Sequence, residues 1–316
     1  MATWPEPPSG RQYEFRAGDQ RTTIVEVGGA IRSYTVGDVD VLDGYGPDER
    51  CSAGRGQSLI PWPNRLAGGR FRFRGEDNQL ALTEPERSNA IHGLVRWANW
   101  APSEQSDDRV VMAYLLHPQP GYPFSLDLRL AYSLTDAGLT VGLEATNVGT
   151  SPLPFGAGAH PYLTLGTEVI DPLVLRAPGS LWLRSDDRQI PIGTEAVDHT
   201  QYDFRAPRPI GATVLDTGYG GLERDRDERA RVDLATEDGS RTLTLWMGPA
   251  YRWLMLFTGD NLSPSKRRTG LAVEPMTCPP NGFQTGEGLI VIEPGETFSD
   301  SWGITPRLAD GGASHR

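Results

Sequence analysis

The sequence predicts an all-β protein, built as a large antiparallel β-sandwich. Its 37 glycines and 26 prolines are spread in short clusters over 316 residues. Between the clusters, apolar side chains recur at every second position, which is the period of a half-buried strand. No stretch combines a sustained helical period with capping residues at both ends. Many short strands separated by turn residues are typical of sandwiches and barrels.

The alternation places strands along most of the chain. In chain order it predicts strands at Thr23–Val27, Arg70–Arg74, Val110–Leu116, Leu126–Leu134, Leu139–Ala145 and Leu243–Met247. The runs that end at Leu134 and begin at Leu139 are separated by Thr135-Asp136-Ala137-Gly138. Because a short turn that contains glycine joins them, these two runs are expected to form an antiparallel hairpin.

The composition indicates a single domain. It shows no shift that would mark a boundary and no repeat of fixed period. We therefore expect one β-sandwich domain over residues 1–316, with an ordered core at about 12–308. The two tails, Met1–Arg11 and Ala309–Arg316, consist mainly of small, polar or proline residues, and they are expected to be loose.

The charge balance excludes several classes of partner. The chain has 30 basic and 41 acidic side chains and a formal net charge of −11, whereas nucleic acids and anionic membranes attract clustered positive charge. The longest apolar run, Val110–Leu116, is far shorter than a membrane-spanning helix. The first residues have neither the basic nor the apolar part of a secretory signal. We expect a cytoplasmic protein with no nucleic-acid or membrane partner.

Lysine and cysteine chemistry is also disfavoured. Lys266 is the only lysine, and its surroundings match neither a phosphate-binding loop nor a Schiff-base site. The two cysteines, Cys51 and Cys278, are far apart, and there is no C-x-x-C or H-E-x-x-H motif. No metal site is expected, so the chemistry must come from carboxylates, histidines and hydrogen-bonding side chains.

One histidine and one glutamate stand directly before a proline in an apolar setting. They are His160, before Pro161, and Glu274, which follows Leu271–Val273 and precedes Pro275. Proline favours extended geometry in its predecessor and withholds an amide from the sheet, so such a residue is expected near a strand end, facing a cleft. Partial burial would raise the pKa of Glu274, as a general base near neutral pH requires.

Three other segments offer polar groups, each with a plain structural alternative. Asn64 and Arg65 lie between prolines and glycines on a stiff connection and supply donors and an acceptor for hydroxyl groups. Arg65 equally fits an ion pair at a sheet edge. His92 lies in a loop bounded by glycine, where a surface histidine is common. Asp216 lies before Thr217-Gly218, a pattern typical of a turn.

Taken in order, these segments resemble the aldose 1-epimerase (mutarotase) family. The strings that carry the resemblance are Asn64-Arg65, His92-Gly93, His160-Pro161-Tyr162, Leu215-Asp216, Glu274-Pro275, Thr277-Cys278-Pro279-Pro280, Pro294-Gly295-Glu296 and Ser301-Trp302-Gly303-Ile304. The similarity covers about residues 20–306. It implies a β-supersandwich and an isomerase that interconverts sugar anomers without a cofactor.

The resemblance also implies roles for individual residues. Glu274 would be the base and His160 the acid, with His92 assisting at the ring oxygen or the anomeric centre. Asn64, Arg65 and Asp216 would hold sugar hydroxyls. On this basis we expect Glu274 and His160 to face each other across a pocket about one pyranose wide. Aromatic side chains usually cover the apolar face of a sugar; the candidates are Trp97, Tyr162, Trp182 and Phe283.

The resemblance is to a divergent branch of the family. Typical galactose mutarotases have two glycines after the first histidine, whereas this sequence has His92-Gly93-Leu94. The divergent branch includes proteins that act on hexoses with a phosphate or sulfonate at C6. Arg55, Arg65 and Arg96 are the arginines considered for such an anionic group.

Two alternatives remain open from the sequence. A glycoside hydrolase would use Glu274 with a second carboxylate such as Asp216, but it would leave His160 without a role. A non-catalytic carbohydrate-binding sandwich would use the same side chains only as contacts. In each case the expected partner is a sugar, here a monosaccharide, and the chain is expected to be a monomer or homodimer.

Overall fold

The computed structural model describes residues 6–308, and these residues are almost entirely β-structure. They form 27 strands, a single 3₁₀ turn η1 (Pro85–Arg87) and one short helix α1 (Gly282–Thr285). The all-β prediction is therefore confirmed. Residues 1–5 and 309–316 of the two predicted loose tails lie outside the described residues. Within 6–308, no helix has the length and apolar character needed to span a membrane.

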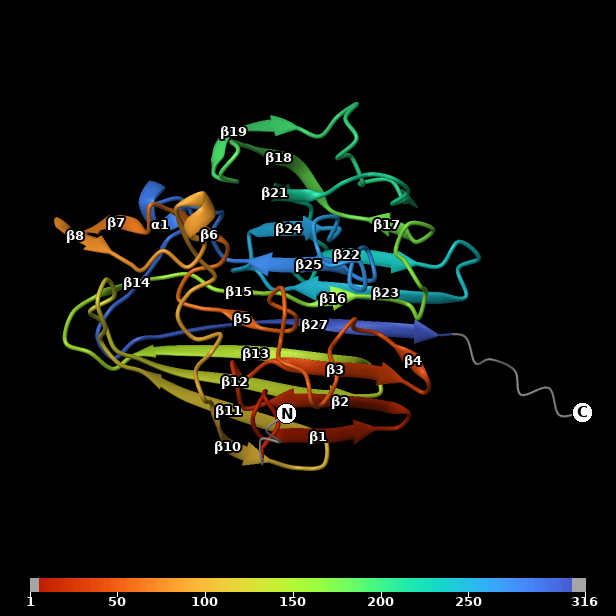
Figure 1. Ribbon diagram of the computed structural model, residues 1–316, viewed down its shortest axis with the longest axis horizontal. Coiled ribbons are helices and arrows are strands. Elements are labelled where there is room, and N and C mark those ends of the chain that lie inside the picture. The colour runs from red at the N-terminus through yellow and green to blue at the C-terminus, as the bar shows by residue number, and fades with distance from the viewer. Residues whose placement is uncertain (1–5, 309–316) are drawn as a thin grey trace, which may run out of the picture.

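The largest sheet has nine strands. Its order is β10 (Ala101–Gln105), β11 (Arg109–Leu116), β12 (Leu126–Thr135), β13 (Gly138–Asn147), β27 (Thr297–Leu308), β23 (Arg241–Met247), β22 (Ala230–Ala235), β17 (Val174–Arg176) and β20 (Arg208–Pro209). All of these pairings are antiparallel. The last strand before the C-terminus, β27, lies in the middle of this sheet (Figure 1).

A second sheet has eight strands and carries most of the predicted site. Its order is β19 (Pro191–Ala196), β18 (Gly179–Ser185), β21 (Asp216–Leu222), β24 (Trp253–Phe257), β25 (Leu271–Met276), β15 (Gly158–Ala159) and β5 (Ser58–Leu59), with β16 (Tyr162–Leu163) also paired to β25. β25 therefore has neighbours on both sides. Its six residues are all buried.

Smaller sheets surround these two. The four-stranded sheet consists of β1 (Gln12–Ala17), β2 (Gln20–Val25), β3 (Ile31–Val36) and β4 (Val39–Asp40), and β1 packs next to β11 and β12 (Figure 1). The two-stranded sheets are β6 (Arg65–Ala67) with β9 (Asn89–Ile91), β7 (Arg70–Phe73) with β8 (Glu76–Gln79), and β14 (Leu153–Phe155) with β26 (Ile290–Ile292).

The central hairpin forms as the alternation predicts. β12 and β13 are paired along their whole length, with Leu134 opposite Leu139. Along β12 the buried positions alternate with partly or fully exposed ones. The buried side chains of this sheet, such as Leu128, belong to the same continuous core as Leu254 and Val273 of the eight-stranded sheet. The two large sheets thus share one core, as in a β-sandwich.

The pairing on one side of β25 is interrupted at a single point. Gly158 of β15 pairs with Met276, and Tyr162 of β16 pairs with Ala272 in the same register. His160 lies between these two short strands, so the register places it opposite Glu274. A residue before proline was expected near a strand end, and His160 lies in the gap between the ends of β15 and β16. Glu274 lies within β25, two residues before its end, and pairs with Met255 on the other side.

Proline explains how Glu274 is tolerated inside a central strand. The amides of Val273 and Thr277 donate to the carbonyls of Pro161 and Ala157, at 3.0 and 2.8 Å. The amide that Pro275 lacks would face the same side, at the break between β15 and β16. The register places Pro275 opposite Ala159, so one hydrogen bond of the ladder is absent there, and the bonds on either side of it hold the strand in place.

The loop after His92 depends on a glycine. Gly93 has φ +71°, and a Cβ added to it would lie 2.0 Å from the carbonyl oxygen of Ile60. The amide of the next residue, Leu94, donates to that same carbonyl at 2.7 Å. Since the obstacle is backbone, it has little freedom to move aside.

We expect Gly93→Ala to destabilise the protein by more than about 2 kcal/mol, because it adds a backbone clash to the strain of a positive φ. Gly37→Ala is the matched control: Gly37 has φ +55° but no atom within 4 Å of an added Cβ, so only about 1 kcal/mol is expected. Urea unfolding of both variants measures the difference. Equal losses would contradict the role assigned to the contact with Ile60.

Candidate functional site

The predicted site residues converge on one pocket of about 340 Å³. Seven of the eight residues line it: Asn64, Arg65, His92, His160, Tyr162, Asp216 and Glu274. They come from the start of β6 and the residue before it, from the loop after β9, from the break before β16 and from β16 itself, and from β21 and β25. The structure therefore brings together segments that are up to 210 positions apart in the sequence. The eighth residue, Trp97, does not line the pocket.

Glu274 and His160 are in direct contact. Oε1 of the carboxyl lies 3.3 Å from Nε2 of the imidazole, and both side chains are more than nine-tenths buried. The expectation that they face each other across the width of a pyranose is therefore wrong. Neighbouring positions on paired strands bring the two side chains side by side, so a ligand must approach both from the pocket.

Burial moves the pKa values of this pair in opposite directions. It raises the pKa of Glu274 well above its usual value, and the nearby Asp216 carboxylate adds to this effect. Burial, together with the charges of Arg96 and Arg55, lowers the pKa of His160 to about 3. Both shifts disfavour charge in the low-dielectric interior. Both shifts therefore favour the uncharged pair, in which a protonated carboxyl lies beside a neutral imidazole and can share its proton with it.

One oxygen of Glu274 is left without a partner. Oε2 is buried, and it makes no hydrogen bond with any residue in the 6–308 range. A buried polar atom without a partner lowers stability. This unsatisfied oxygen adds to the cost of burying Glu274, which lines the pocket.

His92 is held in one tautomer by the backbone. The amide of Asn64 donates to Nδ1 of His92 at 3.2 Å, so the ring proton must be on Nε2. Burial lowers the pKa of His92 well below its usual value, and Arg96 contributes to the shift. His92 is consequently a neutral donor. Its ring meets that of His160 edge to face, with centroids 5.3 Å apart.

Asn64 and Arg65 play different parts in the pocket wall. The side-chain oxygen of Asn64 accepts the amide of Arg65 at 2.9 Å, which leaves the Asn64 NH₂ as a donor. Arg65 makes a bidentate ion pair with Glu84: Nε lies 2.9 Å from Oε2 and Nη2 lies 3.0 Å from Oε1. The structural alternative considered for Arg65, an ion pair, is thus realised within the pocket itself.

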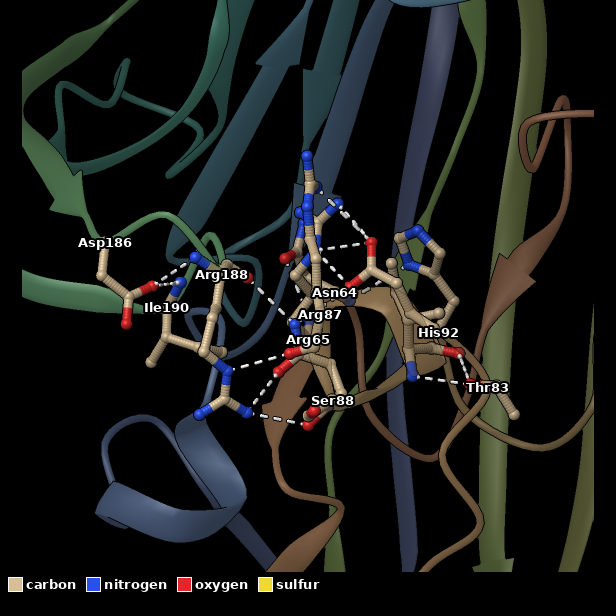
Figure 2. A network of polar contacts seen from close by, with 12 residues as sticks. Asn64, Arg65, Thr83, Arg87, Ser88, His92, Asp186, Arg188 and Ile190 are labelled. Carbon is tan, nitrogen blue, oxygen red and sulfur yellow. Dashed lines mark hydrogen bonds and ion pairs between the residues drawn. The ribbon is translucent and has the colours of Figure 1, made fainter.

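The turn that follows Glu84 is held by hydrogen bonds from Arg188, which lies in the connection between β18 and β19 (Figure 2). Arg188, between β18 and β19, donates to the carbonyls of Arg87 and Ser88, each at 2.8 Å. In return, Asn89 donates to the Arg188 carbonyl and to Glu84, each at 2.9 Å. The β18–β19 connection therefore fixes the segment that holds the partner of Arg65.

Asp216 begins β21 and has a carboxylate free for a ligand. It forms no side-chain hydrogen bond or ion pair with the residues described, and it lines the pocket beside Glu274 and Arg65. Burial raises its pKa, while the nearby arginines, Arg65 and Arg87, oppose this shift. Asp216 can accept hydrogen bonds from hydroxyl groups, as the resemblance implied.

The aromatic candidates are mostly placed elsewhere. Trp97 is 52% exposed, and its ring lies near the guanidinium groups of Arg50 and Arg96. Trp182 packs against Tyr202, and Phe283 is buried in the core against Trp62 and Phe71. The aromatic residues that do line the pocket are Tyr162 and Phe257, of which Phe257 was not predicted.

Sequence reasoning missed three charged residues of the pocket wall, Glu84, Glu86 and Arg87. Glu84 stands before Pro85, so it has the Glu-Pro pattern that singled out Glu274. Its polar flanking residues concealed it. Within residues 6–308 no cluster of three or more histidine, cysteine or acidic side chains is arranged to hold a metal ion.

Comparison with known proteins identifies the relatives of this chain. The family model described as "Aldose 1-epimerase" matches residues 11–305. The uncharacterized protein YihR of Escherichia coli K12 is 33% identical over 289 residues, which are 91% of each chain. An aldose 1-epimerase of Streptococcus thermophilus is 25% identical over 303 residues, covering 86% of this chain and 83% of that protein.

Solved structures show the same fold. The GalM/aldose epimerase homologue from C. elegans has a TM-score of 0.85 at 16% identity, covering 95% of this chain and 99% of that one. A galactose 1-epimerase from Lactobacillus acidophilus has a TM-score of 0.80 at 20% identity, covering 94% and 95%. At these identities the likeness concerns the fold alone.

The ion pair between Arg65 and Glu84 gives a stability prediction. Glu84→Gln leaves the buried guanidinium without its carboxylate, so we expect the free energy of unfolding to fall by about 3 kcal/mol at pH 7. Glu86→Gln, in the same turn but exposed, is the control and should change it by less than about 0.5 kcal/mol. Urea unfolding measures both.

The pH dependence of the same pair checks the cause. Burial alone would raise the pKa of Glu84, but the hydrogen bonds from Arg65 and Asn89 outweigh it and lower the pKa below 4.5. The stabilisation is therefore present above pH 4.5 and is lost as the pH falls through the lowered value. The difference in the free energy of unfolding between the parent and Glu84→Gln should become smaller over that pH range. A constant difference would contradict an ionic origin of the stabilisation.

Proposed function

The chain belongs to the aldose 1-epimerase family, and we propose that it interconverts the α and β anomers of a free hexose or of a hexose substituted at C6. The observation that carries the proposal is the buried contact between Glu274 and His160 at the pocket. It provides a proton acceptor and a proton donor at adjacent positions in the pocket wall.

The direct contact suits ring opening. The two oxygens of a cyclic hemiacetal, O1 and O5, are bonded to the same carbon, C1. An acid and a base that act on them at once must therefore lie beside each other, not on opposite sides of the ring. The 3.3 Å separation of Oε1 and Nε2 satisfies this requirement for a sugar that presents its anomeric edge to the pair.

The proposed reaction conserves protons at each step. In the reactive form, the shared proton is on Nε2 of His160 and Glu274 is ionised. Glu274 accepts the proton of the O1 hydroxyl while the C1–O5 bond breaks, and His160 donates its proton to O5. The open-chain aldehyde turns about the C1–C2 bond, O5 attacks the other face of C1, and the two protons return. General acid and base catalysis of this kind contributes on the order of 10²–10⁴ each.

The remaining residues of the pocket supply binding groups. We assign the Nε2 proton of His92 to the ring oxygen or the anomeric centre, since its neighbour His160 acts there. The NH₂ of Asn64 and the carboxylate of Asp216 offer a donor and an acceptor to sugar hydroxyls. Arg65 donates to Glu84 through Nε and Nη2, and the remaining N–H groups of its guanidinium are offered to the sugar.

The presence of Arg96 in the pocket favours a sugar with a negatively charged substituent. Of the three arginines considered for an anion, Arg65 is paired with Glu84 and Arg55 with Asp43. Arg96 lines the pocket, yet it makes no ion pair within residues 6–308, and burial lowers its pKa. A partly buried cation without a counter-charge favours an anionic ligand.

The position of Arg96 fits a group at C6. Arg96 lowers the pKa values of both His92 and His160, so it lies close to the two histidines. C6 is attached to C5, which is bonded to the ring oxygen. When O5 faces the histidines, a phosphate or sulfonate on C6 lies on the same side of the sugar as Arg96.

The first test of the proposed reaction concerns Glu274 as the base. We expect Glu274→Gln to lower the rate of anomer exchange by at least about 100-fold, because the amide cannot accept the O1 proton. Exchange is followed by polarimetry or by two-dimensional exchange NMR on freshly dissolved α-glucose, α-galactose and their C6-substituted forms. Glu287→Gln, which changes an exposed glutamate outside the pocket, should match the parent.

Three outcomes would oppose this assignment. Exchange by Glu274→Gln at the parent rate would show that another group is the base. Release of reducing sugar from an aryl glycoside, without anomer exchange, would favour a hydrolase that pairs Glu274 with Asp216. Sugar binding with neither activity would favour a carbohydrate-binding module.

The second prediction concerns the substituent. We expect Arg96→Gln to lower kcat/KM for a 6-phosphate or 6-sulfonate hexose by about 10- to 100-fold, while kcat/KM for the neutral hexose changes less than about threefold. The exposed Arg50→Gln is the control, since Arg50 also lies beside Trp97 but not in the pocket. Equal losses on charged and neutral sugars would remove the argument for an anion.

A further inference from the structure

The ring of His160 lacks the hydrogen bond that usually orients a catalytic histidine. In most such sites one ring nitrogen is fixed by a carboxylate or a carbonyl, which sets both tautomer and orientation. Here Nδ1 is buried and has no hydrogen-bond partner among residues 6–308. Only Nε2, on the side of Glu274, has a polar neighbour. The orientation of this ring must therefore come from packing.

The imidazole of His160 packs against two aromatic rings and a glycine. The ring of Tyr162 lies nearly parallel to it, with an interplanar angle of 11° and centroids 5.0 Å apart. Gly54 lies against the ring: a Cβ added there would lie 2.9 Å from Cδ2 of His160. His92 meets the ring edge to face. A parallel aromatic neighbour and a glycine leave the imidazole little room to tilt.

Tyr162 is itself held in place by Arg55. The guanidinium carbon of Arg55 lies 4.3 Å from the centre of the tyrosine ring, and the tyrosine hydroxyl donates to the carbonyl of Ala53 at 3.0 Å. Arg55 is only 1% exposed. Its Nε and Nη2 donate to one oxygen of Asp43, at 3.2 and 3.0 Å, and this fixes the plane of the guanidinium.

Arg55 belongs to a layer behind the pocket. It does not line the pocket, and Asp43, its partner, also accepts hydrogen bonds from Lys266 and Thr269. The order of contacts is Asp43, Arg55, Tyr162 and then His160. This series of contacts connects the Asp43 carboxylate to the imidazole of His160 through the guanidinium of Arg55 and the ring of Tyr162.

We propose that Arg55 is a positioning residue for His160: clamped by Asp43, it holds Tyr162 flat against the imidazole, so that Nε2 stays directed at Glu274 and at the substrate. This inference rests on the proposed function for its kinetic consequences. The stacking replaces the missing hydrogen bond at Nδ1. Cation–π contacts strengthen when they are removed from water, and this one is fully buried.

The charge of Arg55 has a second effect. Arg96, Arg55 and Arg65 all disfavour the imidazolium form of His160, while Glu274 lies on the other side of the ring and Asp216 acts on Glu274. Removal of Arg55 takes away one of these three cations, so the pKa of His160 should rise from about 3 toward its ordinary value.

The test compares Arg55→Met with Lys266→Met. Both variants remove one cation from Asp43, but only the first removes the group above Tyr162. We expect Arg55→Met to lower kcat about 100-fold with KM changed less than about threefold, and NMR titration of the His160 ring to show a raised pKa. Lys266→Met should keep the parent kcat, KM and His160 titration, whatever its loss of thermal stability.

Arg55→Lys is a second variant in case Arg55→Met does not fold. It keeps the ion pair with Asp43, but an ammonium group cannot lie flat on the tyrosine ring, so kcat should still fall about tenfold. Equal kcat and equal His160 titration in the Arg55 and Lys266 variants would overturn the proposal. The NMR titration needs no turnover: an unchanged His160 pKa in Arg55→Met would show that Arg55 does not act on the imidazole, even if the parent exchanges no sugar. A raised pKa reports the lost charge, whereas the fall in kcat of Arg55→Lys, which keeps the charge, reports the positioning.

Discussion

The contact between Glu274 and His160 depends on one irregularity in the eight-stranded sheet. β15 and β16 are two halves of a neighbour to β25, and their shared register leaves His160 opposite Glu274. At the break the backbone of His160 is still fixed: its amide donates to Gln57 and its carbonyl accepts from Gly56, each at 3.0 Å. The imidazole is thereby held opposite the buried strand β25, which keeps the carboxyl at a fixed depth. The low dielectric of this position is what separates the two pKa values.

The arginines of this region are sorted by their partners. Arg55 is locked by Asp43 behind the pocket, and Arg65 by Glu84 in its wall, in each case by a buried ion pair. Arg188 in turn fixes the turn that carries Glu84. An ion pair with such geometry holds planar groups in place more than it adds stability. Because these two are neutralised, Arg96 is the guanidinium of the three whose charge is available to a ligand.

The sequence predicts the strands of this fold better than its contacts. Alternation identifies β12 and β13 because one face of each strand is buried, and this leaves a period of two. The residues before proline, His160 and Glu274, are identified because proline limits the backbone locally. The contact between them depends on a strand register over more than a hundred positions, and no local pattern encodes it. The same holds for Arg65 and Glu84. Trp97 was predicted to lie in the pocket but does not line it, because the sequence shows that an aromatic residue is present but not which way its side chain points.

The same break also explains why a polar pocket is compatible with the core. A buried carboxyl, a buried imidazole and a strand proline would each weaken a continuous sheet. Here they share one place, since the amide missing at Pro275 faces the gap left between β15 and β16. The sheet therefore loses its regular pairing once, and both polar side chains occupy that opening. The atoms left without partners, Nδ1 of His160 and Oε2 of Glu274, lie on the pair itself. Stacking holds the ring that carries the first, and the buried strand β25 holds the carboxyl that carries the second. The residual loss of stability is therefore concentrated on the two groups proposed to act on the sugar.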